Sequence, residues 1–142
     1  MDIKDKKAIV FGGTSGIGLA TCKELQASGA DVVAVSRNPN KASTLIDGIQ
    51  LAAVDARDSD AVSKFFENEG KIDILISSAT GGSRAFGPFL DMDIDGFKRS
   101  FDKLWGYSNV VRYGTAKLDY IVKILRTLFK DFGCNFLVSV NQ

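Results

Sequence analysis

The sequence predicts an α/β fold of three layers, in which helices cover both faces of a doubly wound parallel sheet of about five strands. Three observations lead to this prediction. Short runs of apolar β-formers alternate with segments of helical periodicity. The runs are apolar at successive positions, which is typical of strands buried on both faces. A cluster of four glycines separates the first run from the first helical segment.

The first half of the chain is expected to alternate between strands and helices. Apolar residues recur at helical spacing after the glycine cluster, and Gly29 supplies a stop signal for that helix. The elements expected here are strands at 7–12, 31–36 and 49–55, a helix at 16–28 and a short helix at 40–46.

Two further elements follow the third strand. A helix is expected at 59–70, with Ser59 as its N-cap and Gly70 at its end. The run IDILISS at 72–78 is too continuously apolar for a sheet with one solvent-exposed face. It therefore predicts a fourth buried strand. The glycine-rich stretch at 79–89 predicts a long binding loop.

The last third of the chain carries two helical patterns and a final strand. Helices are expected at 93–112, where Gly106 and Gly114 weaken the pattern, and at 116–133, whose apolar stripe is the clearest in the chain. The run at 134–140 predicts a last strand. We expect right-handed crossovers and a strand order 3-2-1-4-5.

Composition limits the functions to consider. The 142 residues suit one domain spanning 1–142, and a net charge of +1 gives no basic excess for nucleic acid. The absence of histidine argues against a metal site and against a Ser-His-Asp triad. Cys22 and Cys134 lie far apart and are expected to be free thiols. With no membrane-length apolar run and a polar N-terminus, we expect a cytoplasmic protein without membrane contact.

The glycine loop has the sequence context of a dinucleotide-binding site. It follows a strand and opens a helix, so its backbone N–H groups and the helix N-terminus can face a pyrophosphate. Gly12 would let the chain turn off the strand, Gly16 would admit a phosphate, and Gly18 would let the helix pack on the sheet. Thr14 and Ser15 offer hydroxyls to the phosphates. The fold expected is therefore Rossmann-like.

The spacing Gly-x-x-x-Gly-x-Gly, as GGTSGIG, resembles that of the short-chain dehydrogenase/reductase family. SSAT at 77–80 resembles the family's stretch beside the adenosine ribose, and Asp55 in VDARD resembles its acidic adenine contact. DGFKRSFDKLWG looks like its fourth crossover helix, and the resemblance extends over about residues 5–114. The cofactor-binding residues it implies are Gly12, Thr14, Ser15, Gly16, Ile17, Gly18, Ser36, Arg37, Asn38, Asp55, Ala56, Ser78, Ala79 and Thr80.

The end of the second strand favours NADP over NAD. NAD sites usually place a carboxylate there to bind the ribose 2′-OH, and this chain has Ser36 followed by Arg37. A guanidinium can pair with a 2′-phosphate and stack on adenine. Arg37 as a plain surface cation is the alternative.

The family's catalytic pattern, a Tyr-x-x-x-Lys motif preceded by a strand that ends in Ser, is incomplete here. Tyr113 and Lys117 have the spacing but arrive too early, with no serine strand before them. The other alignment takes 134–140 as that strand and puts Ser139 at the serine position; the Tyr-Lys helix would then lie beyond Gln142. Tyr113 and Lys117 as ordinary helix residues are the alternative in either case.

Two kinds of function follow from these residues. One is an oxidoreductase that moves a hydride between NADP(H) and a small carbonyl or alcohol. The other is a catalytically incomplete module that binds NADP(H) or only oligomerises. The apolar stripe at 118–132 would pack against another copy of the chain, which makes a homo-oligomer the expectation, or against the sheet in a way that the family does not use.

Overall fold

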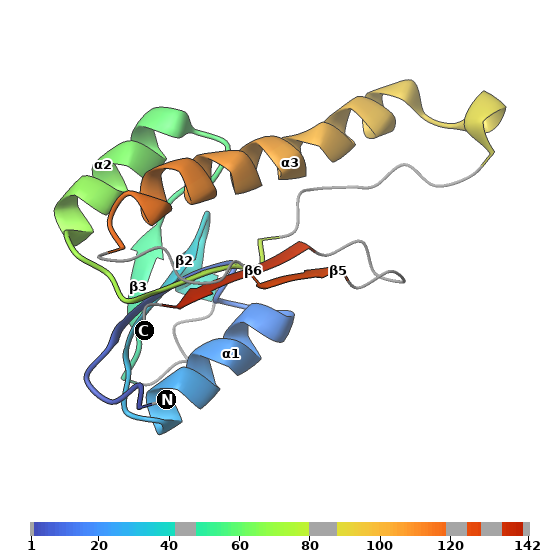
Figure 1. The fold of residues 1–142 in the computed structure, drawn as a ribbon. Helices are drawn as coiled ribbons and strands as arrows, with labels where there is room; N and C mark the ends of the chain where they lie inside the picture. Colours follow the sequence, from blue (N-terminus) through green and yellow to red (C-terminus); the bar gives the residue numbers. More distant parts are fainter. Residues whose placement is uncertain (1, 42–47, 80–87, 119–124, 129–134, 141–142) are drawn as a thin grey trace.

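A computed structural model describes residues 2–41, 48–79, 88–118, 125–128 and 135–140. It confirms the three-layer α/β architecture: helix α1 covers one face of the sheet, and helices α2 and α3 cover the other (Figure 1). The strands are β1 (Lys7–Phe11), β2 (Asp31–Ser36), β3 (Gln50–Ala53), β4 (Ile74–Ser77), β5 (Leu125–Leu128) and β6 (Asn135–Val140). The helices are α1 (Gly16–Ala27), α2 (Ser59–Glu69) and α3 (Ile94–Thr115), with 3-10 turns at Pro39–Lys41 and Phe89–Asp91.

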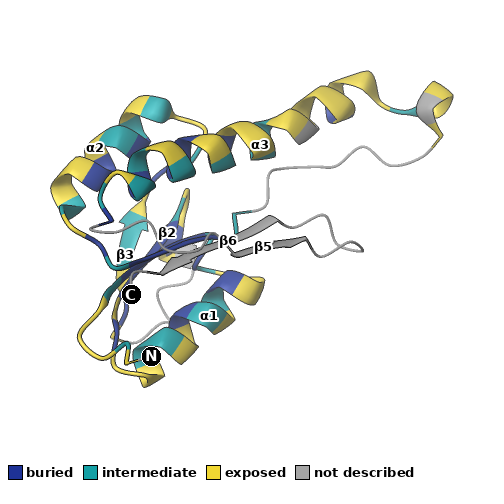
Figure 2. Ribbon diagram, viewed as in Figure 1, coloured by how far each residue is buried: buried dark blue, intermediate teal, exposed yellow. Residues whose placement is uncertain are grey.

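Four parallel strands in the order β3-β2-β1-β4 form the centre of the sheet, as the sequence predicts. Their side chains alternate between two apolar clusters, one on each face. Ala8, Val10 and Cys22 belong to the cluster beneath α1, and Ile9 and Phe11 belong to the cluster beneath α2 and α3. Figure 2 shows this burial along the central strands. Burial on both faces explains why the strands read as continuous apolar runs.

The N-cap of helix α2 lies one residue earlier than predicted. The N-cap is Asp58, whose carboxylate accepts hydrogen bonds from the backbone N–H groups of Asp60 and Ala61, both at 3.0 Å. Ser59 is instead the first helical residue. A carboxylate suits the N-cap position because its negative charge also interacts favourably with the positive N-terminal end of the helix dipole.

Helix α3 continues through both of its glycines, to Thr115 rather than to 112. A Cβ at Gly114 would lie 2.5 Å from Leu75 Cδ2 and 2.7 Å from Phe66 Cζ. A Cβ at Gly106 would lie 3.3 Å from the Cβ of Ala56. These glycines therefore let the helix pack closely on its neighbours, and that packing offsets their low helix propensity.

The outer half of α3 extends past the sheet and is exposed (Figure 2). Large apolar side chains lie along it with more than two-fifths of their area open to solvent. They are Ile94, Phe97, Phe101, Leu104 and Trp105. The rings of Phe97 and Phe101 meet edge to face, with centroids 5.3 Å apart.

The C-terminal part of the fold differs from the prediction in two ways. Strand β6 lies beside β4 as expected but runs antiparallel to it, with Leu75 opposite Ser139. Within the predicted helix 116–133, residues 125–128 form β5, an antiparallel partner of β6. Only a few residues separate β5 from β6, and such a connection makes a hairpin, whereas a parallel pair needs a long crossover. For residues 125–128, pairing with the edge of β6 outweighed the helical periodicity.

Other predictions for the connecting segments are only partly covered by the structure. Leu118 of the predicted stripe is buried and forms a parallel bridge with Ile72. Residues 42–47 of the predicted short helix and 80–87 of the predicted loop lie outside the described residues. Among the helices that the structure describes, none is long and apolar enough to cross a membrane.

Candidate functional site

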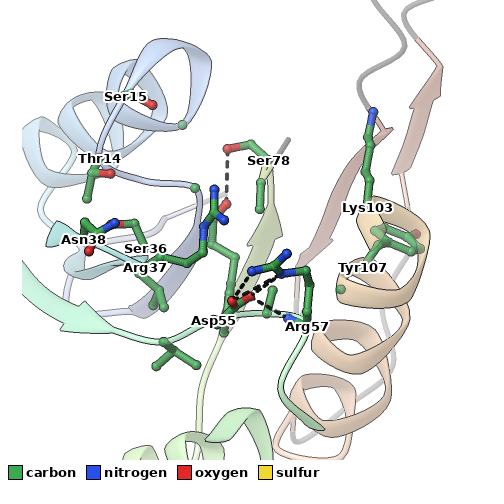
Figure 3. A pocket seen from close by; sticks show the side chains of 18 of the residues that line it. Thr14, Ser15, Ser36, Arg37, Asn38, Asp55, Arg57, Ser78, Lys103 and Tyr107 are labelled. Carbon is green, nitrogen blue, oxygen red and sulfur yellow. Dashed lines mark hydrogen bonds and ion pairs between the residues drawn. The ribbon is translucent and has the colours of Figure 1, made fainter. Parts of the chain in front are cut away.

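A pocket lies at the carboxyl end of the parallel strands, between the first turn of α1 and the middle of α3 (Figure 3). Its volume is about 390 Å³, within the ~300–1,000 Å³ typical of small-molecule sites. Every predicted cofactor-binding residue lines it, apart from Thr80, which lies outside the described residues. Because the strands are parallel, their carboxyl ends bring these distant segments together.

The glycine loop is shaped by its backbone. Gly12 has φ +80°, and its N–H donates to the Val35 carbonyl at 2.8 Å, which ties the loop to β2. A Cβ at Gly12 would lie 2.6 Å from the backbone nitrogen of Ala79. A Cβ at Gly18 would overlap the Gly12 carbonyl oxygen and the Ser78 hydroxyl. These two positions therefore require glycine for a tight turn and a close helix–strand approach.

The start of α1 is open to the pocket. Gly16 has φ +51°, and no atom lies within 4 Å of where its Cβ would be. Ser15 is the N-cap residue, and its side chain makes no capping hydrogen bond. The first N–H groups of the helix and the hydroxyls of Thr14 and Ser15 therefore border the pocket, in an arrangement that suits an anion.

The end of β2 contributes a polar pair. The Ser36 Oγ atom is buried and has no hydrogen-bond partner among the residues that the structure describes. Arg37 follows it, and its side chain extends into the pocket in Figure 3. A buried hydroxyl costs free energy unless it is hydrogen-bonded, so Ser36 fits a ligand that supplies the partner.

Asp55, at the end of the β3 segment, is held by Arg57. Arg57 Nε donates to both carboxylate oxygens at 3.0 and 3.2 Å, and Nη2 donates to Oδ2 at 2.6 Å. These hydrogen bonds are the main reason that the pKa of Asp55 lies below its ordinary value; partial burial opposes them. The same pairing raises the pKa of Arg57. Asp55 is therefore a fixed, ionised carboxylate in the pocket.

No sequence pattern predicted several of the residues that line the pocket. Arg57, Asp102, Lys103 and Tyr107 line the side of the pocket toward α3. They reach it because α3 packs against the segment after β3: Trp105 Nε1 donates to the Arg57 carbonyl and Asn109 Nδ2 to the Ala56 carbonyl, both at 3.0 Å. The apolar lining residues Phe11, Val35 and Val54 immediately precede predicted ones and could have been included on that basis.

The three predicted catalytic residues are not brought together at this pocket. Tyr113 packs against the apolar cluster between α2 and α3, and its hydroxyl shares a hydrogen bond of 3.0 Å with that of Ser59. The carbonyl of Lys117 accepts from the Ile72 N–H at 3.2 Å, at the amino end of β4. Ser139 pairs with Leu75 in the sheet. Their catalytic roles stay predictions.

A protein-family model and curated proteins match most of this chain. The family model described as short chain dehydrogenase matches residues 6–119. L-xylulose reductase of Mesocricetus auratus is 32% identical over 105 residues, which are 72% of this chain and 42% of the reductase. The chain thus spans less than half the length of that curated relative.

Solved structures match over a similar range. A short-chain type dehydrogenase/reductase from Mycobacterium ulcerans superposes with a TM-score of 0.75 at 26% identity, covering 82% of this chain and 48% of that one. A short chain dehydrogenase from Burkholderia cenocepacia J2315, in complex with NADP, superposes with a TM-score of 0.69 at 27% identity, covering 83% and 53%.

Proposed function

Because this chain belongs to the short-chain dehydrogenase/reductase family, we propose that it binds NADP(H) in the pocket described above. We further propose that it is the nucleotide-binding part of an oxidoreductase acting on a small carbonyl or alcohol. The observation that carries the proposal is the buried Ser36 hydroxyl, which has no hydrogen-bond partner within the described part of the chain and lies next to Arg37 at the end of β2. A ligand with a polar group there would supply the partner, and the Arg37 guanidinium would attract a phosphate.

Each part of the nucleotide has residues suited to hold it. The N–H groups at the start of α1 would hold the pyrophosphate, with the hydroxyls of Thr14 and Ser15. Ser36 and Arg37 would hold the 2′-phosphate, and Asp55 would accept from the adenine amine. When bound, the nicotinamide ring supplies or accepts the hydride.

The preference for NADP rests on charge at the end of β2. NAD-binding sites use a carboxylate at this position, and here Ser36 occupies it. A carboxylate would repel a 2′-phosphate, whereas the Arg37 guanidinium attracts one and can bond to it in two places. The Burkholderia structure in complex with NADP supports the same choice.

A catalytically incomplete binding module is the second candidate. It is favoured by the position of Tyr113, whose hydroxyl bonds to Ser59 rather than lining the pocket. If the first candidate is right, Tyr113 and Lys117, or Ser139, would act at the substrate carbonyl. In the second, the described residues bind the nucleotide without transferring a hydride.

Calorimetric titration with NADPH and, separately, with NADH tests the proposal. We expect both to bind and NADPH to bind at least about tenfold more tightly, since hydrogen bonds to a charged group contribute about 1.5–3 kcal/mol. Equal affinities would contradict the role of Arg37. Failure of both to bind would contradict the nucleotide site itself.

Oligomerisation and location are part of the proposal. The exposed apolar side chains on the outer half of α3, from Phe97 to Trp105, suit contact with a second copy of the chain. Light scattering after size exclusion measures the oligomeric state, and Phe101→Lys should shift an oligomer toward monomer.

The buried free thiol of Cys22 suits a reducing compartment such as the cytoplasm.

A further inference from the structure

Arg57 lies between the pocket and α3 and touches both. Its Nε and Nη2 atoms hold the Asp55 carboxylate, and its Nη1 donates to Asp102 Oδ2 on α3 at 3.3 Å. Figure 3 shows the Arg57 guanidinium lying beside the Asp55 carboxylate and joined to it by hydrogen bonds. No family pattern quoted above assigns a role to this arginine.

The backbone of Arg57 is also fixed. Its N–H donates to Asp55 Oδ1 at 3.0 Å, and its carbonyl accepts from Trp105 Nε1 at 3.0 Å. One residue earlier, the Ala56 carbonyl accepts from Asn109, which is only 3% exposed. The guanidinium therefore extends from a backbone that α3 holds in place, so that its position is determined before any ligand arrives.

The Asp55 carboxylate stays accessible from the pocket beside Arg57. Its two oxygens accept from three N–H groups of Arg57, the backbone N, Nε and Nη2, with Nε shared between both oxygens. The side chain is still 32% exposed and lines the pocket. An exocyclic amine on a purine could therefore donate to this carboxylate, whereas a carbonyl oxygen at the same position would face an acceptor and be repelled.

We propose that Arg57 is a positioning residue of the nucleotide site: it orients the Asp55 carboxylate so that the pocket selects a base with an exocyclic amine. This inference rests on the proposed nucleotide function. Arg57 acts through Asp55, whose two oxygens it holds. A planar, bidentate guanidinium is required, because a lysine ammonium in its place would supply charge without fixing the plane of the carboxylate.

The test compares NADPH with its hypoxanthine analogue, reduced nicotinamide hypoxanthine dinucleotide phosphate. This probe has a carbonyl oxygen in place of the adenine amine and the same phosphates. The measured quantity is the ratio of the two dissociation constants on one protein preparation, so an unfolded fraction cancels. We expect the unmodified chain to prefer NADPH by about tenfold, the effect of one hydrogen bond to a charged group.

Variants separate positioning from charge. Arg57→Gln and Arg57→Lys should both reduce the ratio to about twofold or less, although Arg57→Lys keeps the charge. Lys103→Gln, which removes one charge from the pocket lining, should weaken both ligands equally and keep the ratio. In an Asp55→Asn background the ratio should be lost already, and adding Arg57→Gln should change it no further.

The outcomes are distinguishable. If the unmodified chain binds neither nucleotide, the proposed function fails and this inference fails with it. If NADPH binds and Arg57→Gln keeps the full preference over the hypoxanthine analogue, only the positioning role is overturned. If Arg57→Lys keeps the preference and Arg57→Gln loses it, charge alone is responsible and the positioning role is overturned as well.

Discussion

The side chain of Asn109 on α3 donates a hydrogen bond of 3.0 Å to the carbonyl oxygen of Ala56, which lines the pocket at the carboxyl ends of the parallel strands. Asn109 is only 3% exposed, so this contact joins the helix to the site away from water. The placement of α3 and the shape of the pocket are therefore linked.

We expect Asn109→Ala to lower the free energy of unfolding by about 1–3 kcal/mol, because the Ala56 carbonyl is left without its donor. Affinity for NADPH should also fall. Denaturant unfolding and calorimetry measure the two effects. Ser108→Ala is the matched control, since Ser108 is exposed and bonds only to Leu104 within its own helix. An equal effect of both substitutions would contradict the link.

Gly18→Ala should disrupt the site more than Gly16→Ala. The new Cβ at position 18 would overlap the Gly12 carbonyl oxygen, so the loop must move. At position 16 there is space, and only the positive φ of +51° is unfavourable, which costs about 1–2 kcal/mol. Urea midpoints compare their stabilities, and NADPH titration compares their affinities. If Gly16→Ala lowered the stability more than Gly18→Ala, the packing argument would be wrong.

Arg37→Asp should weaken NADPH binding by tenfold or more and leave NADH binding much less affected. The reason is that the aspartate repels a 2′-phosphate, which NADH lacks. Lys64→Asp makes the same charge change on an exposed position of α2, and controls for the general effect of charge. A parallel loss of affinity for both nucleotides would remove Arg37 from the 2′-phosphate site.

Tyr113→Phe distinguishes a packing role from a catalytic one. We expect it to lower the free energy of unfolding by about 1 kcal/mol, because it removes the hydrogen bond with Ser59. Ser59→Ala should have a similar effect, and neither should alter NADPH affinity. In a packing role any carbonyl reduction survives both changes. Loss of turnover in Tyr113→Phe alone, with Ser59→Ala active, would establish the catalytic role.

Cys22 should be unreactive in the folded protein. It is fully buried, and burial raises the pKa of its thiol from 9.0 to about 11. At pH 8 its thiolate fraction is then about a hundredfold lower than that of an ordinary thiol. Iodoacetamide labelling of a Cys134→Ser variant, with and without urea, measures this. Labelling at equal rates in both conditions would show that the thiol is accessible.

The same shift predicts a pH dependence of stability. The folded chain holds the Cys22 proton up to about pH 11, whereas the unfolded chain releases it near 9.0. The contribution of this thiol to stability is therefore complete below pH 9 and is lost as the pH rises through about 11. Cys22→Ala should remove this part of the alkaline loss in urea unfolding measured from pH 8 to pH 11.

The parallel centre of the fold and most of the residues that line the pocket could be predicted from local patterns. An apolar run such as 7–12 and the glycine spacing from Gly12 to Gly18 depend on residues close together in the chain. Such patterns determine strand burial and backbone turns directly. Once the strands are parallel, their carboxyl ends must meet, so Ser36 and Asp55 follow into the same site.

What the tertiary structure decided depends on contacts between distant segments. The contact of Arg57 with Asp102 and the position of Lys103 in the pocket lining follow from how closely α3 packs on the segment after β3, which no local pattern encodes. Strand β6 pairs antiparallel with the open edge of β4, and the strand at 125–128 pairs in turn with β6. Backbone pairing at a sheet edge can override a helical preference, because it satisfies N–H and C=O groups on both partners.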